Sequence, residues 1–358
     1  MQLGIYTFGD LDTRPGAPSV SPGQRLREIL ERVRLAEEVG LHYAGIGEHH
    51  RPDYSISSPA TVMAAALAQT SRIHVGSAVT VLSTEDPVRV YQQFATMDQF
   101  SGGRVELLAG RGSFIESFPL FGANLEDYDE LYEEKLDLLL TLDGGNPVTW
   151  SGRFRPPLTG AEIWPRPTDK PGLGERLRIG IATGGSPASS VRAGTLGLPV
   201  NYAVIGGEPR RFAPLVELYR QAHAKAGHPA AGQHVSVSVH GFLAETDEAA
   251  LETFYPYQLD AGTKLARERG FTLPNRISYE MQASGHGAFV VGSPETVAEK
   301  ILTLHGYLGH DRQNFQMDVS GVPQPESLKA IELLGRAQEL VDVELGAGET
   351  QATATPRE

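Results

Sequence analysis

Residues 43–82 read YAGIGEHHRPDYSISSPATVMAAALAQTSRIHVGSAVTVL and contain one complete strand–helix–strand pattern. The runs YAGIG (43–47) and IHVGSAVTVL (73–82) are short and apolar, as buried strands are, and a helix is expected near residues 59–70. Two strands that are joined by a helical crossover run parallel in one sheet. This stretch therefore predicts a β/α unit.

The same unit recurs along the chain. In the segment 21–40, Ser21 is expected as the N-cap, Pro22 as the first helical residue and Gly40 as the end. Further helices are expected near 87–99, 126–142 and 325–343, and the other strands at 3–8, 104–110, 177–183, 199–205, 234–244 and 314–319. Eight strands that alternate with helices favour a closed (β/α)₈ TIM barrel over an open doubly wound sheet.

Three segments exceed ordinary loop lengths. They span about 111–125, 144–176 and 255–292, and we expect them to be insertions in the loops at the C-terminal rim of one domain, residues 1–345. The tail GAGETQATATPRE (346–358) is expected to be disordered, because it offers nothing to bury in a core.

Composition excludes several functions. The 31 basic and 44 acidic residues give a net charge of −13, which argues against nucleic acid or an anionic membrane as a partner. The chain has no cysteine, so it has no disulfide, thiolate nucleophile or Cys-type zinc site. We find no signal-peptide pattern and no run approaching the ~20 apolar residues of a membrane span, and we expect a cytoplasmic protein.

Barrel topology gathers four loops at one rim, because active sites of such barrels form at the C-terminal ends of the strands. In the loop TGGSPASSVRAG (183–194), two glycines permit close approach to a ligand, and Ser186 is expected as a helix N-cap before Pro187. Free N–H groups at such a helix start attract anions. Ser186, Ser189 and Arg111 are candidate phosphate ligands, although an ordinary capped helix explains this motif equally well.

The sequence EHH at 48–50 fits a metal site poorly. Adjacent histidines on an extended segment point in opposite directions, and the spacing is not that of a zinc helix. A histidine at this rim can exchange protons with a bound heterocycle, and the alternative is a buried histidine beside a structural carboxylate.

Several segments resemble the bacterial luciferase-like (LLM class) flavin-dependent oxidoreductases. They are GIGEHHRPDY, the stretch from VGSAVTVLSTEDPVR to LLAGRGSF, ATGGSPASSVRAGTLGLPV and VGSPETVAEKI, and the likeness runs to about residue 343. The resemblance implies a (β/α)₈ barrel that binds reduced FMN, or the deazaflavin F420, at its C-terminal rim. FMN-dependent members use the reduced flavin to activate dioxygen.

The resemblance also implies roles for individual residues. His49 corresponds to the histidine near the reactive edge of the flavin, with His50 as its neighbour and Glu48 organising the loop. Gly185, Ser186 and Ser189 correspond to positions that hold the phosphate, and Arg111 corresponds to an arginine that meets the cofactor. Tyr6 corresponds to an aromatic residue that packs beside the ring. Relatives often have a non-prolyl cis peptide beneath the ring, and the matching bond here is Ala78–Val79.

The chain departs from true luciferase at Gly110, which stands where luciferase has a reactive cysteine, so light emission is not implied. We therefore predict a flavin-dependent monooxygenase that uses O₂ and reduced FMN, supplied by a separate reductase, on a small or medium organic substrate. An F420-dependent hydride-transfer oxidoreductase and a non-catalytic flavin-binding protein are the alternatives. Relatives commonly form homodimers, for which PATVMAAALAQ (59–69) is a candidate surface.

Overall fold

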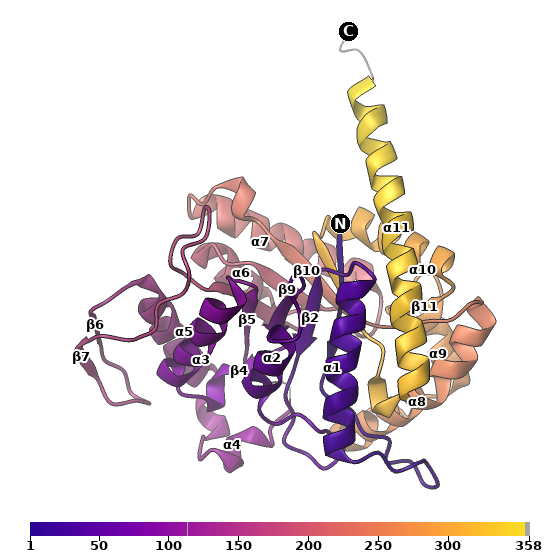
Figure 1. The fold of residues 1–358 in the computed structure, drawn as a ribbon, viewed down its shortest axis with the longest axis horizontal. Coiled ribbons are helices and arrows are strands. Elements are labelled where there is room, and N and C mark those ends of the chain that lie inside the picture. Colours follow the sequence, from indigo (N-terminus) through magenta and orange to yellow (C-terminus); the bar gives the residue numbers. More distant parts are fainter. Residues whose placement is uncertain (113, 355–358) are drawn as a thin grey trace.

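A computed structural model describes residues 1–112 and 114–354, and eight parallel strands in it close into a barrel (Figure 1). Each strand pairs with the next, and the last, β12, pairs back with β1. The (β/α)₈ prediction is confirmed. In order around the barrel the strands are β1 (Gln2–Thr7), β2 (Tyr43–Ile46), β3 (His74–Ser77), β5 (Val105–Gly110), β8 (Arg178–Thr183), β9 (Val200–Ala203), β10 (Val235–Leu243) and β12 (Arg312–Gln316).

Two further short strands extend this sheet. The strand β4 (Thr80–Val81) continues the line of β3 and pairs with the end of β5, and β11 (Val290–Gly292) pairs with the end of β10. Both additions lie toward the C-terminal ends of the barrel strands. They lengthen the sheet on the side where the site is expected.

Helices pack around the outside of the barrel and bury its apolar outward-facing residues (Figure 1). At the first helix, the Ser21 hydroxyl accepts a hydrogen bond from the Gln24 N–H, and Pro22 is the first helical residue, as predicted. The longer helices are α1 (Pro22–Glu38), α2 (Pro59–Leu67), α3 (Pro87–Ser101), α5 (Tyr128–Gly144), α6 (Pro187–Leu196), α7 (Ala213–Lys225), α8 (Asp247–Arg269), α10 (Pro294–Leu308) and α11 (Gln324–Ala354).

The segments expected as long loops contain secondary structure. Residues 111–125 include α4 (Ser117–Leu120), and residues 255–292 contain the second half of α8 (Asp247–Arg269), α9 (Arg276–Ala283) and β11. Most of the insertion at 255–292 is thus helical, and Asn275 starts a new helix in it with a capping box.

Residues 144–176 form an insertion that covers the outside of α3 and α5. The segment contains an antiparallel hairpin, β6 (Val148–Trp150) with β7 (Leu158–Ala161). At its tip Arg155 contacts Asp86, the N-cap of α3, so the tip reaches the C-terminal rim. Its return path ends at the opposite end of α3, where Lys170 pairs with buried Asp98.

The last helix continues beyond the expected core. Helix α11 extends to Ala354, into the tail that we expected to be disordered from residue 346, because extending an existing helix costs less than starting one. Residues 355–358 of that tail lie outside the described residues.

An ion-pair cluster crosses the lower half of the barrel interior. Glu106 of β5 accepts from Arg312 of β12 (Nη1 to Oε2, 2.7 Å) across the barrel, since these strands are not neighbours. His74 Nδ1 lies 2.8 Å from the other oxygen of Glu106, and the Arg312 guanidinium lies over the Tyr43 ring, 4.6 Å from its centre. We call Glu106, Arg312 and His74 the plug.

Candidate active site

The inward-facing residues at the C-terminal ends of the strands are mostly small. Ala78, Ala182 and Ala203 are partly exposed although they belong to the barrel wall, so this end of the interior is open. A planar ring system fits against such a wall, whereas larger side chains would occupy the space. These inward-facing residues are Tyr6, Gly45, Ala78, Gly110, Ala182, Ala203, His240 and Gln316.

The peptide bond Ala78–Val79 is cis, as predicted. It lies between the ends of β2 and β5, and glycine on each side provides the room. A Cβ atom on Gly47 would lie 2.6 Å from the Ala78 oxygen, and one on Gly110 would lie 2.5 Å from a methyl group of Val79. Val79 thus occupies the space that a side chain at position 110 would need, the position where luciferase has cysteine.

An aromatic cluster surrounds His49, which follows β2. The centre of its ring lies 4.4 Å from that of Tyr54, 4.5 Å from that of Phe114 and 4.8 Å from that of Phe8. Its Nδ1 atom lies 3.1 Å from Oε1 of Glu116 on the 111–125 insertion. The imidazole is therefore fixed in orientation and shielded from water on several sides.

Glu48 and His50 form a second, separate pair. Oε1 of Glu48 accepts a hydrogen bond from the Val81 N–H at 2.6 Å, and its Oε2 lies 3.5 Å from Nε2 of His50. The interaction with Glu48 raises the pKa of His50 against the opposing effect of burial. Glu48 thus ties the loop after β2 to β4, and the two histidines have different carboxylate partners.

The loop after β8 has the predicted helix start. The Ser186 side chain accepts from the Ser189 N–H (3.4 Å), Pro187 begins α6, and Gly185 has φ +112°, which favours glycine. The N–H groups of Gly185 and Ser186 both donate to the Thr183 hydroxyl, at 3.2 and 3.1 Å. Sequence reasoning missed this threonine, which fixes the loop and already accepts from two of the N–H groups that an anion would use.

Arg111 follows β5, the neighbour of β8, so the two predicted parts of the phosphate site share one sector of the rim. Its Nη1 donates to Oδ1 of Asp129 on α5 at 2.5 Å, and its guanidinium lies 5.2 Å from the centre of the Tyr128 ring. Binding a phosphate here requires Arg111 to exchange or share this carboxylate partner.

Tyr6 lies at the edge of the small-residue wall, with its ring perpendicular to that of Phe8 at 5.9 Å. Burial, together with the nearby Asp10 and Asp318, raises the pKa of its hydroxyl far above the ordinary value, so Tyr6 stays protonated.

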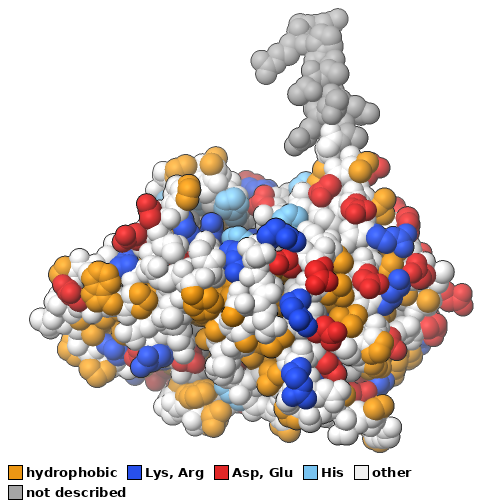
Figure 2. All heavy atoms as spheres, in the orientation of Figure 1, with side chains coloured by type: hydrophobic (Ala, Val, Ile, Leu, Met, Phe, Trp, Pro, Cys, Tyr) orange, Lys and Arg blue, Asp and Glu red, His pale blue; other side chains and the backbone are white. Residues whose placement is uncertain are grey.

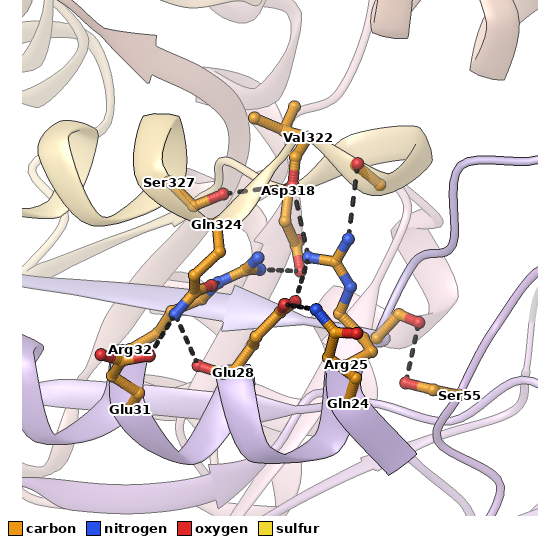
Figure 3. A network of polar contacts seen from close by, with 12 residues as sticks. Gln24, Arg25, Glu28, Glu31, Arg32, Ser55, Asp318, Val322, Gln324 and Ser327 are labelled. Atoms are coloured by element: carbon orange, nitrogen blue, oxygen red, sulfur yellow. Dashed lines mark hydrogen bonds and ion pairs between the residues drawn. The ribbon is translucent and has the colours of Figure 1, made fainter. Parts of the chain in front are cut away.

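A buried polar network joins α1 to the segment after β12 (Figure 3). Asp318, which follows β12, accepts from Arg32 of α1 (2.9 Å) and from the Thr7 hydroxyl at the end of β1 (2.5 Å). Arg25, also on α1, donates to the carbonyl of Val322 (3.3 Å). The network joins β1, α1 and the loop before α11, and no sequence motif predicted it.

Among residues 1–112 and 114–354, no group of three or more His, Asp or Glu side chains is arranged to hold a metal ion. No helix in the same residues is long and apolar enough to cross a membrane.

Comparison with known proteins decides the family. The family model described as luciferase-like monooxygenase matches residues 1–311. The chain belongs to the luciferase-like monooxygenase family. This luciferase-like chain is 25% identical over 307 residues to the luciferase-like monooxygenase of Escherichia coli (strain K12). The match covers 84% of the chain and 86% of that protein. Uncharacterized protein y4vJ of Sinorhizobium fredii is 34% identical, but the match spans only 36% of the chain and 37% of that relative.

Solved structures share the fold over nearly the whole luciferase-like chain. Monooxygenase RslO1 from Streptomyces bottropensis superposes with a TM-score of 0.80 at 24% identity, over 96% of this chain and 100% of that one. The oxygenating constituent of 3,6-diketocamphane monooxygenase from Pseudomonas putida, in complex with FMN, gives 0.72 at 20% identity, over 94% and 96%. An F420-dependent secondary alcohol dehydrogenase gives 0.72 at 16% identity, over 94% and 98%. Both FMN and F420 enzymes therefore occur on this fold.

Proposed function

We propose that the protein is a monooxygenase that uses reduced FMN, delivered by a separate flavin reductase, and O₂ to oxidise a small or medium organic substrate. The observation that carries the proposal is the wall of small, partly exposed residues beside the fixed imidazole of His49. A flavin ring fits against Ala78 with Tyr6 at its edge, and the family membership supports the same ligand.

When bound, the reduced flavin supplies the electrons that activate dioxygen. The protein's residues do the rest. His49, held through Nδ1 by Glu116, presents Nε2 as a proton donor or acceptor at the reacting edge. Phe8, Tyr54 and Phe114 exclude water from this edge.

A second group of residues anchors the cofactor phosphate. Gly185, Ser186 and Ser189 offer the helix start, and Arg111 offers a charge-assisted contact from the next loop. Glu48 and His50 support the loop from which His49 projects.

Charge near the phosphate loop favours FMN over F420, the second candidate, which the fold also supports. F420 carries a tail of glutamates, and the residues around the start of α5 are acidic: Glu126, Asp127, Asp129 and Glu130. Arg111 and Arg153 on this side already pair with Asp129, Asp127 and Glu130, so an anionic tail would have to compete for both arginines, whereas a single phosphate needs to exchange only with Asp129 at Arg111.

Binding titrations of FMN, reduced FMN and F420 test the proposal, followed by NADH-driven oxygen uptake with a flavin reductase and candidate substrates. We expect tight binding of reduced FMN and substrate-dependent oxygen consumption. Exclusive binding of F420 with hydride transfer would replace the proposal by the second candidate. Binding of FMN without turnover of any substrate would indicate a flavin carrier.

We also propose that two copies of the chain pair through the surface of α2 and α3. Hydrophobic side chains lie between charged ones over these helices (Figure 2), and a groove between them is lined by Ala60, Ala64, Met97 and Phe100. Phe100 is 52% exposed. Sedimentation of the wild type and of Phe100→Lys tests this pairing, which predicts a dimer that the charge dissociates.

A further inference from the structure

His240 lies on the inner face of β10, at the same register level as Gln316 of β12. The next residue, Gly241, faces outward, since a Cβ atom there would lie 2.5 Å from the outward-facing Phe315 ring. Because side chains alternate along a strand, His240 points into the barrel. It is partly exposed there, on the side of the wall opposite β3 and β5.

Two neighbours fix the imidazole of His240. Its Nδ1 lies 3.3 Å from Oε1 and 3.2 Å from Nε2 of the Gln258 side chain on α8, and its ring stacks on Phe289 at 5.7 Å with 24° between the planes. Among the residues that the structure describes, no side chain or backbone group bonds to Nε2 of His240. Burial lowers the pKa of His240 to about 4, so the ring is neutral at physiological pH.

The neutral imidazole can form a hydrogen bond with either a hydroxyl group or a carbonyl group of a ligand. If the Gln258 amide oxygen accepts from Nδ1, then Nε2 accepts a hydrogen bond from a hydroxyl group. If the Gln258 amide nitrogen donates to Nδ1, then Nε2 donates to a carbonyl group. Gln258 thus positions the ring without restricting the ligand to one of the two.

The surroundings of His240 favour aromatic ligands. Phe289 contacts Tyr279 (6.1 Å between ring centres), and Tyr279 contacts Tyr255 (5.2 Å). An aromatic series therefore runs from α8 and α9 to the inner face of the barrel. Aromatic walls bind planar apolar groups through large contact areas and stacking.

Cations on the neighbouring loops already have carboxylate partners. Arg14 pairs with Asp12 at 2.7 Å, and Lys264 pairs with Asp260 at 2.9 Å. Arg51 pairs with Glu268 at 2.6 Å. An anionic substrate would have to break such a pair, and an uncharged substrate does not.

We propose that His240 is a specificity-determining residue, which binds through Nε2 the hydroxyl or carbonyl oxygen of an uncharged aromatic substrate packed against Phe289. This inference rests on the proposed oxygenase function and names the class of its substrate.

The inference is tested with three probes that share the naphthalene ring and differ in one substituent: naphthalene, 2-naphthol and 2-naphthoate. Dissociation constants are measured by saturation-transfer NMR or calorimetry on the full chain, with and without FMN. In the wild type we expect 2-naphthol to bind about 3- to 10-fold more tightly than naphthalene, the range of one neutral hydrogen bond, and 2-naphthoate to bind most weakly.

His240→Phe keeps an aromatic ring against Phe289 but removes the hydrogen bond, so naphthalene should bind as before and the preference for 2-naphthol should disappear. Gln258→Leu should reduce the preference in part, because Nδ1 loses its partner. His234→Phe is the matched control, because His234 lies just before β10 at the opposite end of the barrel. This variant should keep the wild-type affinity of 2-naphthol relative to naphthalene and of 2-naphthoate relative to naphthalene.

The possible failures are distinguishable. If the wild type does not bind FMN, the proposed function fails, and the probe ratios measured without FMN still test His240. An unchanged 2-naphthol preference in His240→Phe overturns the role of His240. Tighter binding of 2-naphthoate overturns the uncharged class, and binding of none of the probes up to millimolar concentration overturns the aromatic class.

Discussion

Nδ1 of His49 lies 3.1 Å from Oε1 of Glu116, a residue that stands 67 positions later in the chain. The contact connects the loop after β2 to the insertion after β5, and it leaves Nε2 as the ring nitrogen of His49 for the proton exchange that we propose. Burial is the largest single influence on Glu116 and favours its neutral form, but the interaction with His49, a backbone hydrogen bond and the nearby Arg51 together outweigh burial and lower the pKa of this carboxyl.

We predict that His49→Asn lowers coupled substrate oxidation by about 10²–10⁴-fold, the usual effect of a general acid or base, with little change in folding or FMN affinity. If the variant unfolds while activity per folded molecule survives, His49 is a structural residue.

Glu116→Gln should lower the same rate less than His49→Asn does, because the imidazole remains but its orientation is less fixed. The double variant should be no slower than His49→Asn alone, since Glu116 acts through His49. Steady-state kinetics and FMN titration of the three variants provide the measurement, and additive losses would contradict the coupling.

Substitutions of Arg111 and of its partner Asp129 should change the affinity for FMN in opposite directions. Arg111→Ala should weaken FMN by about 10- to 100-fold and riboflavin hardly at all, because the lost charge-assisted contact exists only with the phosphate. Asp129→Asn frees Arg111 and should strengthen FMN while leaving riboflavin unchanged. Equal changes for both ligands would remove Arg111 from the phosphate site.

Gly110→Ala should disturb the small-residue wall, because the added Cβ atom would lie 2.5 Å from a Val79 methyl group and one of the two must move. We expect a lower melting temperature and weaker FMN binding. Gly144→Ala is the matched control, since an added Cβ atom there meets no atom within 4 Å. Normal FMN binding by Gly110→Ala would show that this part of the wall does not contact the ring.

Stability should fall as the pH is lowered from about 6.5 toward 4. Burial lowers the pKa of His310 to about 3 and that of His240 to about 4, while both titrate near 6.5 in the unfolded chain. Between these values the unfolded state binds more protons, so acid favours unfolding, by at most about 1.4 kcal/mol per pH unit for each histidine. Urea unfolding at several pH values measures the slope, which should be shallower in His240→Phe.

Most of the barrel could be predicted from the sequence, because each strand is a short apolar run and each following helix carries its own start signal. Ser21 and Ser186 illustrate this, since their capping contacts form within three residues of the chain. The hairpin of β6 and β7 escaped prediction because its strands are short, mostly exposed and not periodic.

The candidate site was predictable only where local motifs carry it. His49, Arg111 and Ser186 lie in recognisable loops, but their partners Glu116, Asp129 and Thr183 have no motif of their own. The contact of Arg32 with Asp318 joins residues at the two ends of the chain. Such pairings depend on the closed fold, and one sequence gives no means of reading them in advance.

The plug of Glu106, Arg312 and His74 has a kinetic consequence. Because it crosses the lower half of the barrel, a flavin and a substrate bound as we propose would both enter and leave through the C-terminal rim. Whichever ligand arrives second then blocks the escape of the first. Binding should therefore follow a compulsory order, with the flavin first, and excess substrate should slow the exchange of spent flavin with its reductase.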